Sequence, residues 1–301
     1  MTAVTQAPVV PARRLRFMTT VQQPARRHAL VRAWWWALDY VYAAVRQLAV
    51  VTAPWTLGRP RPVPRAWRSG SEDLPEIILL PGVYEHWTFL RPLGNALNAA
   101  GHRVNVVHGL GMNSRGIAET SERLGRALAS RPPRSAGRVL VAHSKGGLIG
   151  KHLLVSSGAA VAAAVEAAAG GDPADAAAAA TAPADDSSGR PLGLLGLVAV
   201  CTPFHGSPLA ALFFVPSIRA FLPDDETIVM LGNEESVNGR IVSVFGHFDP
   251  HIPDGSALSG ATNVLVPASG HFRVLGSRHT HAAVIDGVRM LSSGGPEHDQ
   301  R

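Results

Sequence analysis

The chain contains 301 residues, of which 46% are hydrophobic and 17% are charged. A chain of this length and composition can bury a full core, so wholesale disorder is excluded and one large domain with an extension is expected. The formal net charge of +6 belongs to the N-terminal part, because residues 1–70 hold eleven arginines against a single acidic residue, Asp39.

Residues 1–28 are polar and basic and have no sustained helical or strand periodicity, so a flexible arm is predicted there. Five arginines interrupt this stretch and no small-residue cleavage site follows an apolar segment, which argues against a signal peptide. The protein is therefore expected to be cytoplasmic or peripherally associated with a membrane. The single cysteine, Cys201, cannot form an internal disulfide and ends an apolar run, which is typical of a buried thiol.

The next segment, residues 29–53, has the pattern of an amphipathic helix in which Arg32, Asp39 and Arg46 are seven positions apart. Its uncharged stretches are too short to cross a bilayer. Two interpretations stay open: the helix lies in a membrane interface with its three consecutive tryptophans at headgroup depth, or it packs on the protein body or on a second subunit. No nucleic-acid-binding motif accompanies the arginines, so no such partner is expected. Residues 54–75, rich in proline and arginine, are predicted to be a linker.

From Glu76 onward, short apolar runs alternate with helical stretches, which predicts a mostly parallel sheet with helices on both faces. Strands are predicted at 77–80, 104–107, 139–142, 194–201, 241–245 and 263–266, and helices near 88–100, 117–130, 145–157 and 278–292. The alanine-rich tract at about 158–191 is longer than a crossover needs and is predicted to be a low-complexity surface insertion. The chain thus divides into an extension (1–75), an α/β domain (76–293) and a flexible tail (294–301).

The strongest local signal is an apolar strand at 139–142, followed by His-Ser-Lys-Gly-Gly at 143–147 and an apolar helix. A serine in such a motif lies on a strained turn between strand and helix. The small residues two positions before and after it, Ala142 and Gly146, let the two elements approach. Ser144 is therefore predicted to be a nucleophile.

Three further short motifs lie at or after the end of a predicted strand. They are Leu-Leu-Pro-Gly-Val-Tyr at 79–84, Thr-Pro-Phe-His-Gly-Ser-Pro at 202–208 and Gly-His-Phe at 270–272. Together with the serine motif, they make residues 76–292 resemble the bacterial lipase and esterase branch of the α/β-hydrolase superfamily. The resemblance implies the α/β-hydrolase fold and an oxyanion hole formed by the backbone N–H groups of Val83 and Lys145. Pro81 stands where such lipases carry a histidine, a change that backbone donors tolerate.

The same resemblance implies a cap-like segment over the active site, at about residues 205–235. Its apolar residues either form an acyl-binding wall or pack in the ordinary way. The candidates for the substrate pocket are Tyr84, His143, Phe204, His205, Phe213 and Phe214.

A serine hydroxyl needs an imidazole base that is oriented by a carboxylate, and the hydrolase fold supplies them in the chain order serine, acid, histidine. The resemblance assigns the base to His271, which follows the last predicted strand. It assigns the acid to Asp249 in the loop after the strand at 241–245, with Asp254 in the same loop as the alternative.

The spacing His-x-Asp-x-His at 247–251 also permits a metal site. A turn is expected to begin there, and the triad accounts for Asp249 without a metal, so no metal and no cofactor are predicted. The expected function is hydrolysis of carboxylic esters, small-molecule or lipid-like, by a Ser-His-Asp triad through an acyl-enzyme. The alternatives are acyl transfer by the same triad, and a catalytically silent protein of the same fold that binds a membrane or a partner. The oligomeric state, the acyl chain length and the head group stay open.

Overall fold

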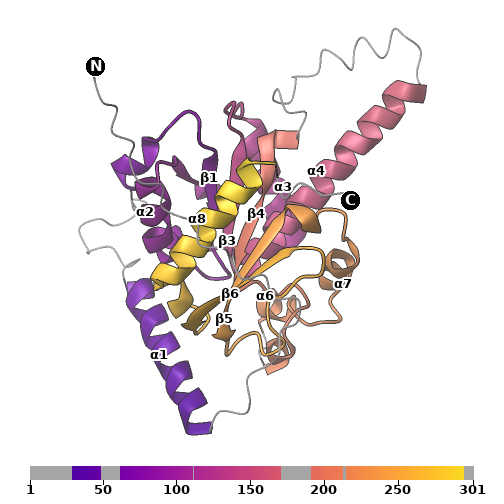
Figure 1. Ribbon diagram of the computed structural model, residues 1–301. Helices are drawn as coiled ribbons and strands as arrows, with labels where there is room; N and C mark the ends of the chain where they lie inside the picture. The colour runs from indigo at the N-terminus through magenta and orange to yellow at the C-terminus, as the bar shows by residue number, and fades with distance from the viewer. Residues whose placement is uncertain (1–28, 49–61, 111, 171–190, 213–214, 295–301) are drawn as a thin grey trace, which may run out of the picture.

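A computed structural model describes residues 29–48, 62–110, 112–170, 191–212 and 215–294 (Figure 1). The predicted arm over 1–28 lies outside the described residues, and so does nearly all of the predicted tail, 294–301. Parts of the predicted linker and of the alanine-rich insertion also lie outside them.

Six strands form one sheet in the order β2-β1-β3-β4-β5-β6, and every neighbouring pair is parallel. The strands are β1 (Glu76–Leu80), β2 (Val104–Val106), β3 (Arg138–His143), β4 (Leu194–Val200), β5 (Ile241–Phe248) and β6 (Thr262–Ser269). Every residue of β3 and β4 is buried, as expected of parallel strands that are covered on both faces. The predicted α/β class with a parallel sheet is confirmed.

Alternate residues of each strand point to opposite faces of the sheet. In β1, Ile77 and Leu79 belong to one apolar cluster, and Ile78 and Leu80 belong to the other. The helices that cover the first face are α2 (Arg91–Ala99) and α8 (Arg278–Ser292), and those that cover the second are α3 (Ile117–Ala129) and α4 (Lys145–Gly170), as Figure 1 shows. The core therefore has two layers of helices with the sheet between them.

Shorter elements connect these helices and strands. They are the 3₁₀ helices η2 (Arg65–Arg68), η3 (Trp87–Leu90), η4 (His108–Leu110), η5 (Pro191–Gly193), η6 (Pro208–Leu212), η7 (Asn238–Arg240) and η8 (Arg273–Gly276), and the short helices α6 (Pro216–Arg219) and α7 (Glu226–Asn233). Several of them, η6, α6 and α7, fall in the segment that was predicted to be cap-like.

Several element boundaries differ from the sequence prediction, most of all the C-terminal ends of α4, β5 and β6, the last of which continues to Ser269 rather than ending at 266. Helix α4 continues to Gly170, well beyond the predicted end at 157, because the tract that follows is rich in alanine, the strongest helix former. Strand β5 continues to Phe248, although a turn was expected after 245. The polar and glycine residues at its end interrupt the apolar run, but Gly246 still pairs with Val266 of β6. Backbone pairing, which the side chains do not reveal, extends this strand.

Helix α1 (Ala29–Leu48) lies within the segment where a helix was predicted, and one side of it packs against η3 and η8. Asp39 on this helix is fully buried, whereas Trp34, Val45 and Leu48 are exposed. Of the two interpretations left open by the sequence, packing on the protein body is the one that the structure supports, and contact with a lipid surface stays a prediction. No helix among the described residues combines the length and the hydrophobicity that crossing a bilayer requires.

Candidate active site

The order of the strands creates a crevice at the carboxyl ends of β1 and β3. The chain leaves β1 toward β2 on one side and later returns to β3 on the other, so the helices that follow the two strands cover opposite faces. Ligands of open α/β sheets bind at such a switch point. The loop after β1 carries Gly82 and Val83, and Ser144 follows β3 directly, so two of the motifs found in the sequence meet at this crevice.

Ser144 occupies a strained turn between β3 and α4. Its φ is +51°, in the left-handed region that residues other than glycine rarely adopt. Its N–H donates to the carbonyl oxygen of Val200 at 2.9 Å, and its own carbonyl oxygen accepts the hydroxyl of Thr202 at 3.0 Å. These two bonds to the end of β4 and the residues after it fix the turn at the carboxyl edge of the sheet.

The glycines after Ser144 allow α4 to lie close to its neighbours. A methyl group at Gly146 would overlap the backbone carbonyl of Leu80, and one at Gly147 would overlap the side chain of Thr202. The small residue that the motif requires two positions after the serine is therefore needed for the approach of α4 to the end of β1.

A Gly146→Ala substitution is expected to destabilise the protein by about 1–3 kcal/mol or more, because the added methyl group meets backbone that cannot move without disturbing the sheet. Gly158→Ala is the matched control on the same helix, since a methyl group there meets nothing within 4 Å. The control is expected to stabilise the protein by about 0.5–1 kcal/mol. Urea unfolding measures both, and a Gly146→Ala protein as stable as the parent would contradict this packing.

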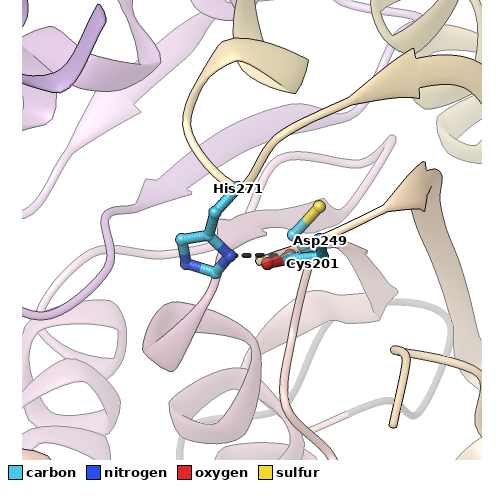
Figure 2. A group of neighbouring side chains, drawn as sticks. All are labelled: Cys201, Asp249 and His271. Atoms are coloured by element: carbon cyan, nitrogen blue, oxygen red, sulfur yellow. Dashed lines mark hydrogen bonds and ion pairs between the residues drawn. The ribbon is translucent and has the colours of Figure 1, made fainter. Parts of the chain in front are cut away.

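His271, in the loop after β6, and Asp249, in the loop after β5, form a buried pair. His271 Nδ1 lies 2.8 Å from Asp249 Oδ2, and the imidazole faces the carboxylate in Figure 2. The other carboxylate oxygen, Oδ1, accepts the N–H groups of His251 at 2.8 Å and Ile252 at 3.2 Å. Asp254 is exposed in the same loop. Of the two acids considered from the sequence, the structure thus brings Asp249 to His271.

The surroundings of this pair set its protonation. Burial acts to raise the pKa of Asp249, but the neighbouring His271 and then His251 outweigh it, so the pKa lies below its ordinary value. Burial acts to lower the pKa of His271, but Asp249, with weaker contributions from Glu85 and Asp39, outweighs it, so that pKa lies above its ordinary value. Asp249 is therefore ionised near neutral pH and accepts the Nδ1–H of His271. The opposite nitrogen, Nε2, can accept a proton when the ring is neutral.

Cys201 lies beside Asp249, and its sulfur, the carboxylate and the imidazole form a group whose ligand atoms all lie within 4.8 Å of one another (Figure 2). The metal group suggested by the sequence is not assembled, because His247 is exposed at the end of β5 while Asp249 is buried. Burial, followed by the charge of Asp249, raises the pKa of the Cys201 thiol. Cysteine binds a metal as the thiolate, which the raised pKa disfavours, and the carboxylate and imidazole of this group are already bonded to each other. These residues fit a neutral thiol beside a carboxylate better than a metal centre.

A cavity of about 480 Å³ opens beside Ser144 and His271, both of which line it. Its walls are mostly apolar and come from α1, from the loop after β1 and from the cap-like segment. Examples from these three parts are Ala43 and Ala44, Val83 and Tyr84, and Ile218 and Phe221. The cavity can therefore surround an apolar group whose reacting atom lies at Ser144.

Of the residues predicted to line the substrate pocket, Tyr84 borders this cavity. Phe204 and His205 do not, because the chain makes a tight turn after β4 that directs their side chains elsewhere. Phe204 is buried in the apolar cluster on the α4 face of the sheet, and His205 is exposed. Phe213 and Phe214 lie outside the described residues.

His143 and Glu85 connect the loop after β1 to the loop that carries His271. Glu85 Oε2 accepts the N–H of Gly82 at 2.7 Å, and its Oε1 lies 2.7 Å from His143 Nδ1. The opposite nitrogen, His143 Nε2, lies 2.9 Å from the carbonyl oxygen of His271. Because a carbonyl oxygen only accepts, Nε2 is the donor in this hydrogen bond. His143, predicted as a pocket residue, instead holds backbone, and nothing in the sequence marks Glu85.

Val83 and Lys145, the two predicted backbone donors, lie in segments that are connected by hydrogen bonds through Asn113. Lys145 is the first residue of α4, where N–H groups have no acceptor within the helix. Its ammonium group donates to the carbonyl oxygens of Asn113 and Arg115. The side chain of Asn113 in turn donates to the carbonyl oxygen of Pro81 at 2.7 Å, which fixes the loop that contains Val83.

Solved structures of a lipase, a carboxyl esterase and a thioesterase domain align with this chain. Lipase B of Aspergillus fumigatus aligns with a TM-score of 0.51 and 17% sequence identity over 75% of this chain and 55% of the lipase, so this chain spans about half of the lipase's length. A metagenomic carboxyl esterase aligns with a TM-score of 0.45 and 14% identity over 79% of this chain and 80% of that one. A thioesterase domain from the curacin biosynthetic pathway aligns with a TM-score of 0.43 and 12% identity over 73% and 92%. No protein-family model matches the sequence, and neither does any curated protein.

The chain has the α/β-hydrolase fold, as the likeness to the lipase and the parallel sheet with helices on both faces show. At this level of sequence identity the likeness extends to the fold alone. The fold that the sequence motifs implied is thus confirmed, whereas the assignment to the bacterial lipase and esterase branch stays a prediction, as do the roles of the site residues.

Proposed function

We propose that this protein is a serine hydrolase that cleaves carboxylic esters with an apolar acyl part. The observation that carries the proposal is that Ser144 and His271 border the same mostly apolar cavity, while Asp249 bonds to the Nδ1 of His271 behind it. A serine on a strained turn, an imidazole bound to a carboxylate and backbone N–H groups at the start of a helix are the parts that acyl transfer to serine requires.

In the proposed reaction, Nε2 of His271 takes the hydroxyl proton of Ser144 as the serine oxygen attacks the carbonyl carbon of the ester. The oxyanion accepts the N–H groups of Val83 and Lys145, each of which contributes a factor of roughly 10² to 10³ to the rate. His271, now protonated and stabilised by Asp249, gives its proton to the leaving alcohol, and the acyl group stays on Ser144. Water activated by the same imidazole then releases the carboxylic acid and restores the serine hydroxyl.

The substrate class follows from the walls of the cavity. Apolar side chains from α1 and from the cap-like segment can bury an acyl chain. A charged acyl group would lose its hydration against these apolar walls, which is unfavourable. The hydroxyl oxygens of Tyr84 and Ser217 lie 2.6 Å apart, so the loop after β1 and the cap-like segment meet beside the cavity. Lipid-like esters therefore suit this site better than short or charged ones.

Hydrolysis of p-nitrophenyl esters from acetate to palmitate by the full-length protein tests this proposal. Each methylene that enters the cavity contributes about 0.8 kcal/mol, so kcat/KM is expected to rise about fourfold per methylene until the cavity is filled. Reaction with a fluorophosphonate probe, followed by peptide mapping, should give modification at Ser144. Adding glycerol and analysing the products separates hydrolysis from acyl transfer. Failure to hydrolyse any ester, together with failure to react with the probe, would rule out the proposed function.

A further inference from the structure

Helix α1 delivers one buried carboxylate, that of Asp39, to the backbone around His271. Asp39 Oδ2 accepts the N–H of His271 at 3.0 Å. Its Oδ1 accepts the N–H groups of Phe272 and Arg273, each at 2.9 Å. Three consecutive backbone donors, the last of which is the first residue of the 3₁₀ helix η8, therefore converge on a side chain from a helix more than 200 positions earlier in the chain.

The burial of Asp39 calls for a role, because removing a carboxylate from water is unfavourable unless its oxygens are fully bonded. No residue of α1 whose burial is described is as buried as Asp39, and its neighbours Trp34, Val41 and Val45 are exposed. The helix thus places one charged group in the interior and directs it to the loop that carries the candidate base. A helix that served only to cover apolar surface would need no such group.

The backbone of His271 is held from both sides. Asp39 accepts its N–H, and His143 Nε2 donates to its carbonyl oxygen at 2.9 Å. Gly270, just before it, has a φ of +107°, and a side chain there would begin only 2.5 Å from Asp39 Oδ1. The loop has therefore no room for a side chain where the carboxylate lies. With both backbone groups bonded and Nδ1 on Asp249, the imidazole has one orientation.

We infer that Asp39 is a positioning residue for His271, so that α1 is a functional part of the active site rather than an appended extension. This inference rests on the proposed role of His271 as the base. The same helix contributes Tyr40, Ala43 and Ala44 to the wall of the cavity. The packing of α1 on the protein body therefore both forms part of the cavity wall and fixes the position of His271.

Kinetics of the full-length Asp39→Asn and Asp39→Ala proteins test the inference. Asparagine is isosteric, and its oxygen can still accept the N–H groups of Phe272 and Arg273, but its NH₂ then faces the N–H of His271. Alanine removes all three bonds. We expect kcat for a soluble ester to fall roughly 10- to 100-fold in Asp39→Ala, the scale of a misplaced catalytic group, and to fall less in Asp39→Asn. KM is expected to change little, because Asp39 does not line the cavity. Val45→Ala, at an exposed position of the same helix, is the matched control and should behave as the parent.

The pH profile provides a readout that a purely structural role would not move. The ionisable groups around His271 are Asp39, Glu85, His143, Cys201, Asp249 and His251. Burial, followed by the charge of His271, lowers the pKa of His251 to about 3, so His251 stays neutral in the working range. Burial also acts to lower the pKa of His271, and Asp39 is one of the carboxylates that oppose it. Removing this charge lowers the pKa of His271, so the acid limb of kcat/KM should move to lower pH in both Asp39 variants.

The outcomes separate this inference from the proposed function. A parent protein that hydrolyses esters, together with Asp39 variants that have lower kcat and a shifted acid limb, supports it. Variants that only melt at a lower temperature, while kcat per probe-reactive site and the acid limb match those of the parent, overturn it and leave the hydrolase intact. A parent protein without activity or probe reaction overturns the proposed function itself, and this inference with it.

Discussion

A Ser144→Ala protein is expected to lose ester hydrolysis by roughly 10⁵- to 10⁶-fold in kcat and to remain folded. Without the serine oxygen no acyl-enzyme forms, and the residual rate comes only from binding and from the backbone donors. The fold should tolerate the change, because the bonds that fix this turn are made by the backbone N–H and C=O of residue 144. Steady-state hydrolysis of the best ester, probe labelling and thermal melting measure the three expectations.

Ser207→Ala is the matched control for Ser144→Ala, since Ser207 also lines the cavity. Its hydroxyl already donates to the carbonyl oxygen of His251 at 2.7 Å. Its loss therefore removes one hydrogen bond, worth about 1 kcal/mol, and should lower kcat by no more than about fivefold. Labelling is expected to persist in Ser207→Ala and to vanish in Ser144→Ala. The reverse result would move the nucleophile to Ser207.

The sheet and the strained turn at Ser144 could be predicted because both depend on residues close in sequence or on simple burial. Parallel strands covered on both faces read as apolar runs, so the core of each strand was found. Gly146 was found because the serine motif requires a small residue two positions after Ser144, and a side chain there would overlap the backbone of Leu80. Prediction failed where backbone pairing extends an element without apolar side chains, as at His247, which is exposed and yet belongs to β5.

The residues that hold the candidate catalytic groups in place could not be predicted, because their contacts join residues far apart in the chain. Asp39 and His271 are 232 positions apart, and Glu85 and His143 are 58 apart. A single buried carboxylate leaves no periodicity, and its partners are backbone N–H groups that every residue possesses. The one hint was that Asp39 is the only acidic residue in an otherwise basic segment. Sequence reasoning therefore finds the chemical groups of such a site more readily than the groups that hold them.

Asp249→Asn is expected to lower kcat by about 10⁴-fold, although it changes almost no volume. Asp249 Oδ1 accepts two backbone N–H groups, those of His251 and Ile252, and Oδ2 accepts the Nδ1–H of His271. An asparagine keeps its oxygen toward the two backbone donors, which directs its NH₂ at His271 Nδ1. That nitrogen must then accept, so the ring proton moves to Nε2, where it prevents His271 from taking the proton of Ser144.

The pH profile of Asp249→Asn and the control variant Asp254→Asn distinguish a specific role of Asp249 from a general effect of losing a carboxylate. Asp249 is the strongest influence that raises the pKa of His271 against its burial, so in Asp249→Asn the acid limb of kcat/KM should move to lower pH. The plateau should stay low, because the tautomer is wrong wherever the ring is neutral. Asp254→Asn, exposed in the same loop, is the matched control and should keep both the plateau and the limb of the parent. A large loss of kcat in Asp254→Asn with none in Asp249→Asn would assign the role of the acid to Asp254. Equal small losses of kcat in both variants would show that neither carboxylate takes part in the reaction.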